Sequence, residues 1–170
     1  LNAMKGPNTR IVAPQNVYAA MPASLQSIAT VMTNGATASV SGISIEAVPA
    51  YNTTADRLNY HPKGRDNGYV LTLGGKRIYV SGDTEDISEM RALKNIDVAF
   101  VSMNPPFTMD VTQAASAVRE FKPRVVYPYH FFNARAAGIR GSIQDITRLK
   151  QLIGNDPGTE VRIRPWYINF

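Results

Sequence analysis

The segment Arg77-Ile78-Tyr79-Val80-Ser81-Gly82-Asp83-Thr84 joins a β-branched, aromatic run to a glycine and an acid. The run predicts a buried strand, so Asp83 is presented where that strand gives way to a helix. The ligand-binding groups of α/β sheets gather at this position. The run Val125-Val126-Tyr127-Pro128-Tyr129 ends in the same way, on His130. We therefore expect Asp83 and His130 to lie on one rim of one sheet, as half of a metal site.

The composition is typical of a globular domain with a packed core. The chain has 170 residues, of which 44% are hydrophobic and 18% charged, and we expect one domain over residues 1–170. It has no cysteine, so a metal would be held by imidazole, carboxylate or water. The longest apolar stretches are far shorter than the roughly 20 residues that span a bilayer, and we expect no membrane contact. The lack of cysteine leaves the redox compartment open, and our expectation is a cytoplasmic protein.

Further elements are predicted on both sides of the first segment. Apolar residues at spacings of three and four predict a helix over residues 17–32, and alternation predicts one or two edge strands over residues 39–50. Gly74-Gly75 is typical of the two-residue turn of a hairpin over residues 69–80. The elements expected after the hairpin are a helix over 84–94, a strand over 98–101, a capped helix over 110–121, a helix over 142–154 and a strand over 160–164. This order predicts an α/β fold with one sheet packed by helices.

Each candidate site residue has a structural alternative. Asp83, with an acid three residues further on, has the pattern of a helix N-cap. His130 lies between Tyr129 and Phe131, where a histidine can serve packing alone. His61 lies in a polar loop, where the alternative is a solvated turn. The residues alone leave both interpretations open.

Several short motifs follow one another along the chain. They are Val48-Pro49-Ala50-Tyr51-Asn52, His61-Pro62-Lys63-Gly64, Gly68-Tyr69-Val70, Ile78 to Thr84, Ile96-Asp97-Val98, Phe107-Thr108-Met109 and Tyr127-Pro128-Tyr129-His130. In order and spacing they resemble the metallo-β-lactamase-fold hydrolases, in particular the ascorbate-6-phosphate lactonase-like branch. The resemblance covers nearly the whole chain. It implies a metallo-β-lactamase-like αββα sandwich, of which this chain is the C-terminal portion.

The resemblance also implies a metal centre with one or two divalent ions, zinc or alternatively manganese or iron. Asp83 matches the carboxylate that bridges two metals, and His130 matches the late histidine of the second site. A bridging carboxylate holds two cations about 3.5–4 Å apart, and water between them becomes a hydroxide nucleophile near neutral pH. Thr84 is a candidate for contact with the ligand Asp83.

Two departures from the family pattern limit what this chain can hold. The H-x-H-x-D-H motif that supplies most ligands is missing, and the chain opens as though inside a helix that ends at Gly6-Pro7. We therefore expect a fragment, with no appreciable hydrolytic activity on its own and a partial or absent metal. The family also commonly has a histidine ligand where this chain has Asn52, so His61 is a candidate third ligand or a substrate contact.

The expected substrate is a small molecule with a lactone, phosphoester or similar ester bond. Lys63 and Arg65 favour an anionic substrate, although basic residues in a polar loop are often only solvated. The candidate pocket residues are Tyr51, Asn52, Lys63, Arg65, Asn104 and Phe131.

Two other functions compete with hydrolysis. The first is a non-catalytic binding or assembly domain, in which Asp83 caps a helix and His130 packs among aromatic residues. The second is a nuclease of the same superfamily, supported only by the sequence pI of about 9.6. The net charge of +5 is not concentrated in an arm, so nucleic-acid binding is not indicated. Exposed inner faces of the incomplete sandwich also predict homo-oligomers or aggregation.

Overall fold

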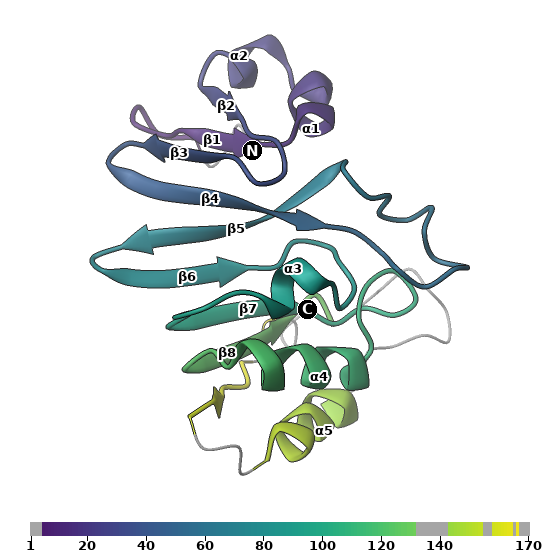
Figure 1. The fold of residues 1–170 in the computed structure, drawn as a ribbon. Coiled ribbons are helices and arrows are strands. Elements are labelled where there is room, and N and C mark those ends of the chain that lie inside the picture. The colour runs from purple at the N-terminus through teal and green to yellow at the C-terminus, as the bar shows by residue number, and fades with distance from the viewer. Residues whose placement is uncertain (1–4, 132–142, 155–157, 165, 167–170) are drawn as a thin grey trace.

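A seven-stranded mixed sheet forms the centre of the molecule (Figure 1). The computed structural model describes residues 5–131, 143–154, 158–164 and 166. The strands follow one another across the sheet in chain order: β3 (Thr37–Val40), β4 (Ile43–Ala50), β5 (Asp66–Leu73), β6 (Lys76–Val80), β7 (Val98–Ser102), β8 (Val125–Tyr129) and β9 (Glu160–Val161). Strands β3 to β6 pair antiparallel, and β6 to β9 pair parallel. The C-terminal ends of β6, β7 and β8 therefore lie along the same rim.

Helices cover one face of this sheet. They are α3 (Ser88–Arg91), α4 (Val111–Phe121) and α5 (Ile143–Ile153). The main core lies between them and the sheet, where Tyr79, Val101 and Val126 are fully buried. Asp110 caps α4 through a capping box with Gln113, as the sequence predicts. These elements confirm the expected α/β fold with a mixed sheet packed by helices.

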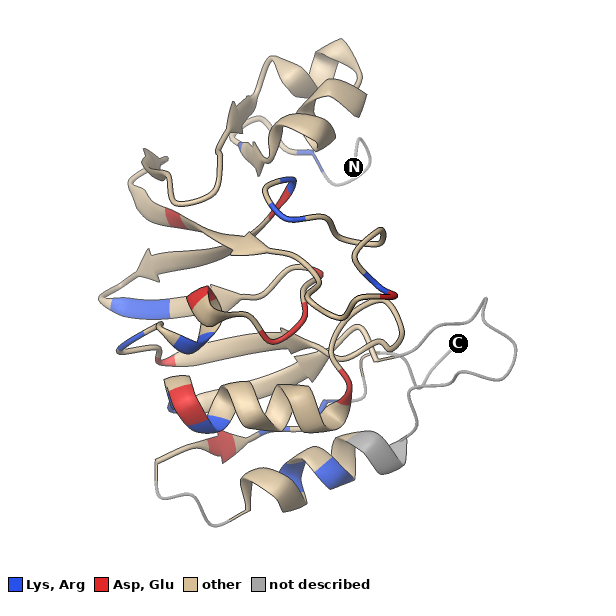
Figure 2. Ribbon diagram, turned by 45° about the vertical axis from the view of Figure 1, so that its right-hand side comes forward, with Lys and Arg blue, Asp and Glu red and all other residues tan. Residues whose placement is uncertain are grey.

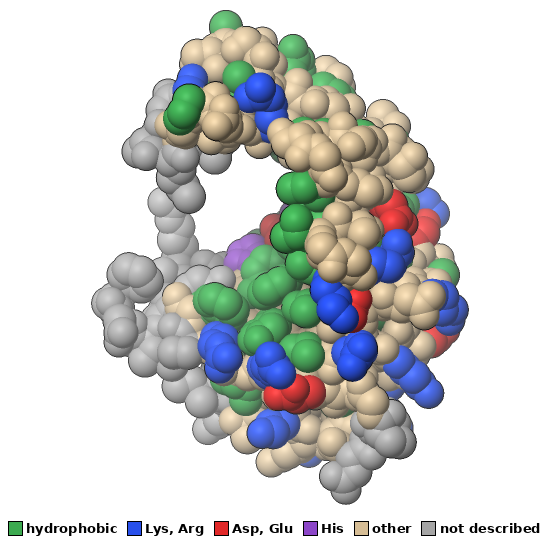
Figure 3. Space-filling model, turned by 90° about the vertical axis from the view of Figure 1, so that its left-hand side faces the viewer, with side chains coloured by type: hydrophobic (Ala, Val, Ile, Leu, Met, Phe, Trp, Pro, Cys, Tyr) green, Lys and Arg blue, Asp and Glu red, His purple; other side chains and the backbone are tan. Residues whose placement is uncertain are grey.

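The opposite face of the sheet is apolar but only partly buried. One row of neighbours in register runs from the buried Ile45 through the partly buried Leu71, Ile78, Val98 and Val125. Figure 3 shows hydrophobic side chains gathered in a hollow, with lysine and arginine along one border and a histidine at its inner end. Strands that are apolar on both faces are typical of sheets covered on both sides. We call this surface the open face.

A smaller unit lies beside the β3–β4 edge. It consists of β1 (Ile11–Ala13), α1 (Gln15–Ala20), α2 (Ala23–Gln26) and β2 (Ala29–Val31), with β1 and β2 pairing parallel. Its attachment includes Met32, which packs against Ile45 and Ala47 of β4. No helix among the described residues is long and apolar enough to cross a membrane.

Several predicted elements need correction. The single helix over residues 17–32 is wrong: Pro22 lies between two short helices, and the β-branched residues near Thr30 pair with β1 instead. The helix over 84–94 is reduced to α3, because residues just after Asp83 are bonded to the loop after β4. Asp83 as a helix N-cap is also wrong, since α3 begins at Ser88 after an extended Ile87. The last strand is only Glu160–Val161, the part that pairs with β8. The hairpin turn at Gly74-Gly75 is confirmed by positive φ at both glycines.

Candidate metal centre

A close backbone approach fixes the position of Asp83. Gly82, which precedes it, has φ +64°, and a Cβ there would lie 2.6 Å from the carbonyl oxygen of Asn67. The strand end of β6 is therefore pressed against the beginning of β5 at this point. Only glycine avoids both the strained backbone and the overlap. The sequence Ser81-Gly82-Asp83 thus aims the carboxylate beyond the rim of the sheet.

His130 meets this carboxylate from the end of β8. Its Nδ1 lies 3.0 Å from Asp83 Oδ1, and both side chains are 37% exposed. The hydrogen bond with Asp83 raises the pKa of His130, against the effect of burial. On the other side of the ring, Nε2 lies 3.2 Å from the amide nitrogen of Asn104. The structure therefore brings together the two residues that the sequence places on one rim.

His61 approaches the same carboxylate from the loop between β4 and β5. Its Nε2 lies 3.8 Å from Asp83 Oδ2, while its Nδ1 lies 3.2 Å from Asp66 Oδ2. The two oxygens of Asp83 therefore face two different imidazoles. Burial raises the pKa of Asp66, but hydrogen bonds from Arg65 and His61 outweigh it and hold that pKa below its usual value. Asp66 is then an ionised partner that orients His61.

These three side chains have the donor chemistry of a metal site but not a complete donor set. Carboxylate oxygen and imidazole nitrogen are ligands of zinc, manganese and iron. Within the described part of the chain, however, no group of three or more His, Cys, Asp and Glu is placed so that it could hold a metal ion. Asp83, His61 and His130 are spaced as hydrogen-bonded and charge-paired neighbours. A metal here would need further donors.

Tyr51 and Lys63 lie together on the helix side of the sheet. Tyr51 is buried, and its hydroxyl donates to Glu89 Oε2 over 2.9 Å. The Lys63 amine lies 4.7 Å from the centre of the Tyr51 ring and 3.9 Å from Glu89 Oε1. The structure therefore places these two predicted pocket residues in a contact with Glu89 of α3. Arg65 is paired with Asp66 and donates to the carbonyl of Tyr60.

Asn52 is buried and holds the loop between β4 and β5 through its hydrogen bonds. Its amide nitrogen donates to the carbonyls of Arg57 and Phe107, at 3.1 and 2.8 Å, and its backbone N–H donates to the carbonyl of His61. Its side-chain oxygen has no hydrogen-bond partner among the described residues. Asn52 therefore positions the backbone of His61, whatever its role toward substrate.

The remaining predicted residues divide between the cluster and the core. Asn104 belongs to the cluster through His130, and Phe131 is buried in the main core. The Thr84 hydroxyl donates to the carbonyl of Tyr51 and accepts from its N–H, at 3.0 and 3.1 Å. Thr84 thus joins the segment after Asp83 to the end of β4.

Sequence reasoning missed two acids, Asp66 and Glu85. Asp66 begins β5 and orients His61, and Glu85 is fully buried against residues 53–57. The available signal for Asp66 was its nearness to His61 in sequence. Glu85 had no such signal, because an acid two residues after Asp83 has the pattern of a helix first turn.

Comparisons with known proteins give a consistent picture. The family model described as "Beta-lactamase superfamily domain" matches residues 2–131. A UPF0173 metal-dependent hydrolase of Pyrococcus abyssi is 33% identical over 126 residues, which are 72% of this chain and 55% of that protein. One from Thermococcus onnurineus is 33% identical over 131 residues, 75% of this chain and 58% of that protein. The chain thus spans somewhat more than half the length of these curated relatives.

Solved structures match over most of this chain. A Parabacteroides distasonis protein named as a metal-dependent hydrolase has a TM-score of 0.80 and 44% identity, over 96% of this chain and 67% of that one. A metallo hydrolase of Ignicoccus hospitalis has a TM-score of 0.72 at 23% identity, over 96% and 68% of the two chains. The second likeness concerns the fold alone.

Proposed function

Since the chain belongs to the beta-lactamase superfamily, we propose that it supplies part of the active site of a metal-dependent hydrolase. The carrying observation is the carboxylate of Asp83, which lies between His130 and His61 at the C-terminal rim of the parallel strands. In this proposal the three residues, together with further donors, would hold a divalent metal, zinc or alternatively manganese or iron. Such a metal, when bound, lowers the pKa of its water and thereby supplies a hydroxide nucleophile.

The protein's own residues prepare this site. Asp83 is fixed by Gly82, and it holds the ring of His130 by a hydrogen bond of 3.0 Å. Asp66 holds His61 from behind, so its Nε2 is directed toward Asp83. Asn104 supplies a polar amide beside His130, where it could contact substrate after exchanging partners. Side chains that are held in a fixed orientation in this way bind a metal more tightly.

The proposed substrate is a small ester, and lactones and phosphoesters are the first to test. Membership of the ascorbate-6-phosphate lactonase-like branch is part of this proposal. Support for an anionic substrate from Lys63 and Arg65 is reduced, because each already contacts a carboxylate, Glu89 or Asp66. Basic and acidic residues are interspersed along the ribbon in the view of Figure 2, which does not favour the nuclease.

We further propose that this chain alone has no appreciable hydrolytic activity. A binuclear centre needs more donors than Asp83, His61 and His130, and within the described residues no group of three or more His, Cys, Asp and Glu is placed so that it could hold a metal ion. A cytoplasmic location and self-association through the open face remain predictions.

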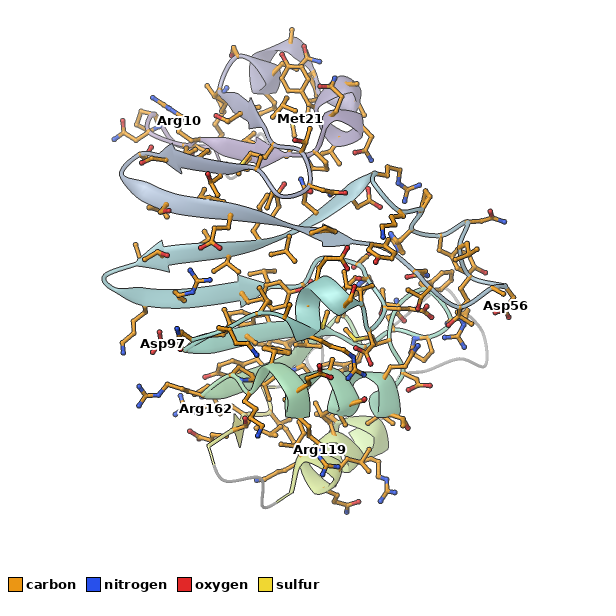
Figure 4. All side chains as sticks on the ribbon, in the orientation of Figure 1. Arg10, Met21, Asp56, Asp97, Arg119 and Arg162 are labelled. Atoms are coloured by element: carbon orange, nitrogen blue, oxygen red, sulfur yellow. The ribbon has the colours of Figure 1, made fainter. Side chains whose placement is uncertain are left out.

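Calorimetric titration of Zn²⁺ and Mn²⁺ into the whole protein tests the metal site. The unaltered protein is compared with Asp83→Ala, His130→Ala and a control, Asp97→Ala. Asp97 lies at the other end of the sheet from the loop after β4, which carries Asp56 (Figure 4). We expect the control to bind metal like the unaltered protein and the two cluster variants to bind it much more weakly. Equal binding in all four proteins, or none in any, contradicts the metal site and favours a non-catalytic domain.

Activity is measured on the whole protein, loaded with metal, with lactone and phosphodiester substrates. We expect turnover that chelators abolish and that Asp83→Ala reduces by several orders of magnitude. The 170-residue chain should show none. Chelator-sensitive turnover by this chain would contradict its proposed inactivity.

A further inference from the structure

Glu85 is a completely buried carboxylate that the proposed metal centre does not use. It lies two residues after Asp83, with no exposed side-chain surface. Oε2 accepts hydrogen bonds from the backbone N–H groups of Thr53 and Thr54, both at 2.7 Å, and from the Thr53 hydroxyl at 3.2 Å. Oε1 accepts from the Thr54 hydroxyl at 2.8 Å and from Arg57 Nη1 at 3.2 Å. Five donors from one short loop therefore converge on one anion.

This donor set is that of an oxyanion-binding loop. Consecutive backbone N–H groups form concave anion sites in proteins, and hydroxyls and a guanidinium strengthen them. Burying a carboxylate is costly unless its oxygens are hydrogen-bonded, and here both are. Both oxygens of Glu85 only accept hydrogen bonds from these five donors, as the oxygens of an ionised carboxylate do. The carboxylate is thus well matched to the loop.

The same loop determines where His61 lies. The Asn52 side chain donates to the carbonyl of Arg57, and the Asn52 N–H donates to the carbonyl of His61 at 2.8 Å. Glu85 itself is joined by one residue to Asp83, the carboxylate that His61 faces. The contact from Glu85 to residues 53–57 therefore closes a ring that runs through Asn52, His61 and Asp83.

We propose that residues 53–57 form an oxyanion site which the chain fills with its own Glu85, and that Glu85 is thereby a positioning residue for His61. The anion-binding part stands on the contacts of Glu85 alone. The consequence for His61 as a ligand rests on the proposed function.

Chemical rescue tests the anion site. Glu85→Ala removes the carboxylate and leaves space beside the five donors, so formate should bind there. We expect the melting temperature of this variant to fall and then to rise saturably with added formate, at constant ionic strength. The unaltered chain and Glu46→Ala, which removes a partly buried carboxylate paired with Arg77, should show no such saturable rise. Glu85→Gln should also not respond, because its amide fills the space.

Two further measurements make the test decisive. If Glu85→Ala does not fold in buffer, it is refolded over a formate series, and formate-dependent recovery of the circular dichroism spectrum replaces the melting curve. In Glu85→Ala/Arg57→Ala the formate response should be strongly reduced. The amide resonances of Asn52 and His61 should shift in Glu85→Ala and return with formate, whereas those of α4 should not.

The proposal is overturned if formate has the same effect on Glu85→Ala and Glu46→Ala, or no effect on Glu85→Ala. Rescue of stability without return of the His61 resonance would overturn the positioning role alone. None of these measurements uses metal or turnover, so they remain informative if the hydrolase proposal fails.

Discussion

Replacement of Gly82 by alanine tests how much the close backbone approach next to Asp83 contributes to stability, beyond the conformational cost of alanine at a positive φ. Gly82 has φ +64°, and its added Cβ would lie 2.6 Å from the carbonyl oxygen of Asn67. A left-handed conformation costs a residue with a Cβ roughly 1–2 kcal/mol. Forcing an additional methyl group into a packed region costs about 1–3 kcal/mol more. We therefore expect Gly82→Ala to lower the free energy of unfolding by about 2–5 kcal/mol in total.

Gly75→Ala is the matched control. Gly75 has φ +74°, and nothing lies within 4 Å of its added Cβ. This variant should lose only the conformational part, about 1–2 kcal/mol. Urea unfolding followed by circular dichroism measures both losses, and an unchanged m-value shows that the comparison is valid. Equal losses in the two variants would refute the argument that the backbone approach at Gly82 fixes Asp83.

Three further predictions follow from contacts described above. Thr84→Val should cost about 1–3 kcal/mol in urea unfolding, because it leaves the buried N–H of Tyr51 without its partner, whereas Thr84→Ser should cost less. In the metal-free chain, pairing with Asp83 raises the pKa of His130 above its unfolded value of about 6.5. The pairing therefore stabilises the fold fully below pH about 6.5, and this stabilisation is lost as the pH rises through the pKa of His130 in the folded chain. The melting temperature of Asp83→Asn should therefore lie further below that of the unaltered chain at pH 5.5 than at pH 9. An equal difference in melting temperature at both pH values would contradict the pairing. Phe100 lies two residues after Val98 in β7 and therefore on the open face, where it lines a pocket with Val80, Tyr129 and Trp166. Phe100→Lys should lower the apparent mass in sedimentation velocity if that face drives self-association, and an unchanged mass would count against it.

Strand ends were the most predictable part of the site. The β-branched runs before Asp83 and His130 predicted two strands, and parallel pairing through β7 brings their C-terminal ends to one rim. That topology brings the two side chains to neighbouring positions, and they lie 3.0 Å apart. A periodic pattern and its end point were sufficient here because backbone pairing dominates the geometry.

Loop geometry was not predictable in the same way. The loop that carries His61 is held by the five hydrogen bonds to Glu85, by the bond from the Asn52 N–H to the carbonyl of His61 and by the contact between Asp66 and His61. The bonds to Glu85 join segments far apart in sequence, and the other two depend on the path of the loop. Such contacts leave no periodic trace. The predicted helix over residues 17–32 failed for a related reason, since apolar spacing did not distinguish a helix from two short helices and a strand that pairs with β1.

The open face affects how any stability of this chain must be measured. Its apolar residues are stabilised by any apolar partner that covers them, including detergent, hydrophobic dyes or another copy of the chain. A partner that binds only the folded form stabilises that form by mass action. Melting temperatures should consequently rise with protein concentration and with amphiphilic additives. Variant comparisons are therefore meaningful only at one fixed protein concentration and in buffers free of such additives.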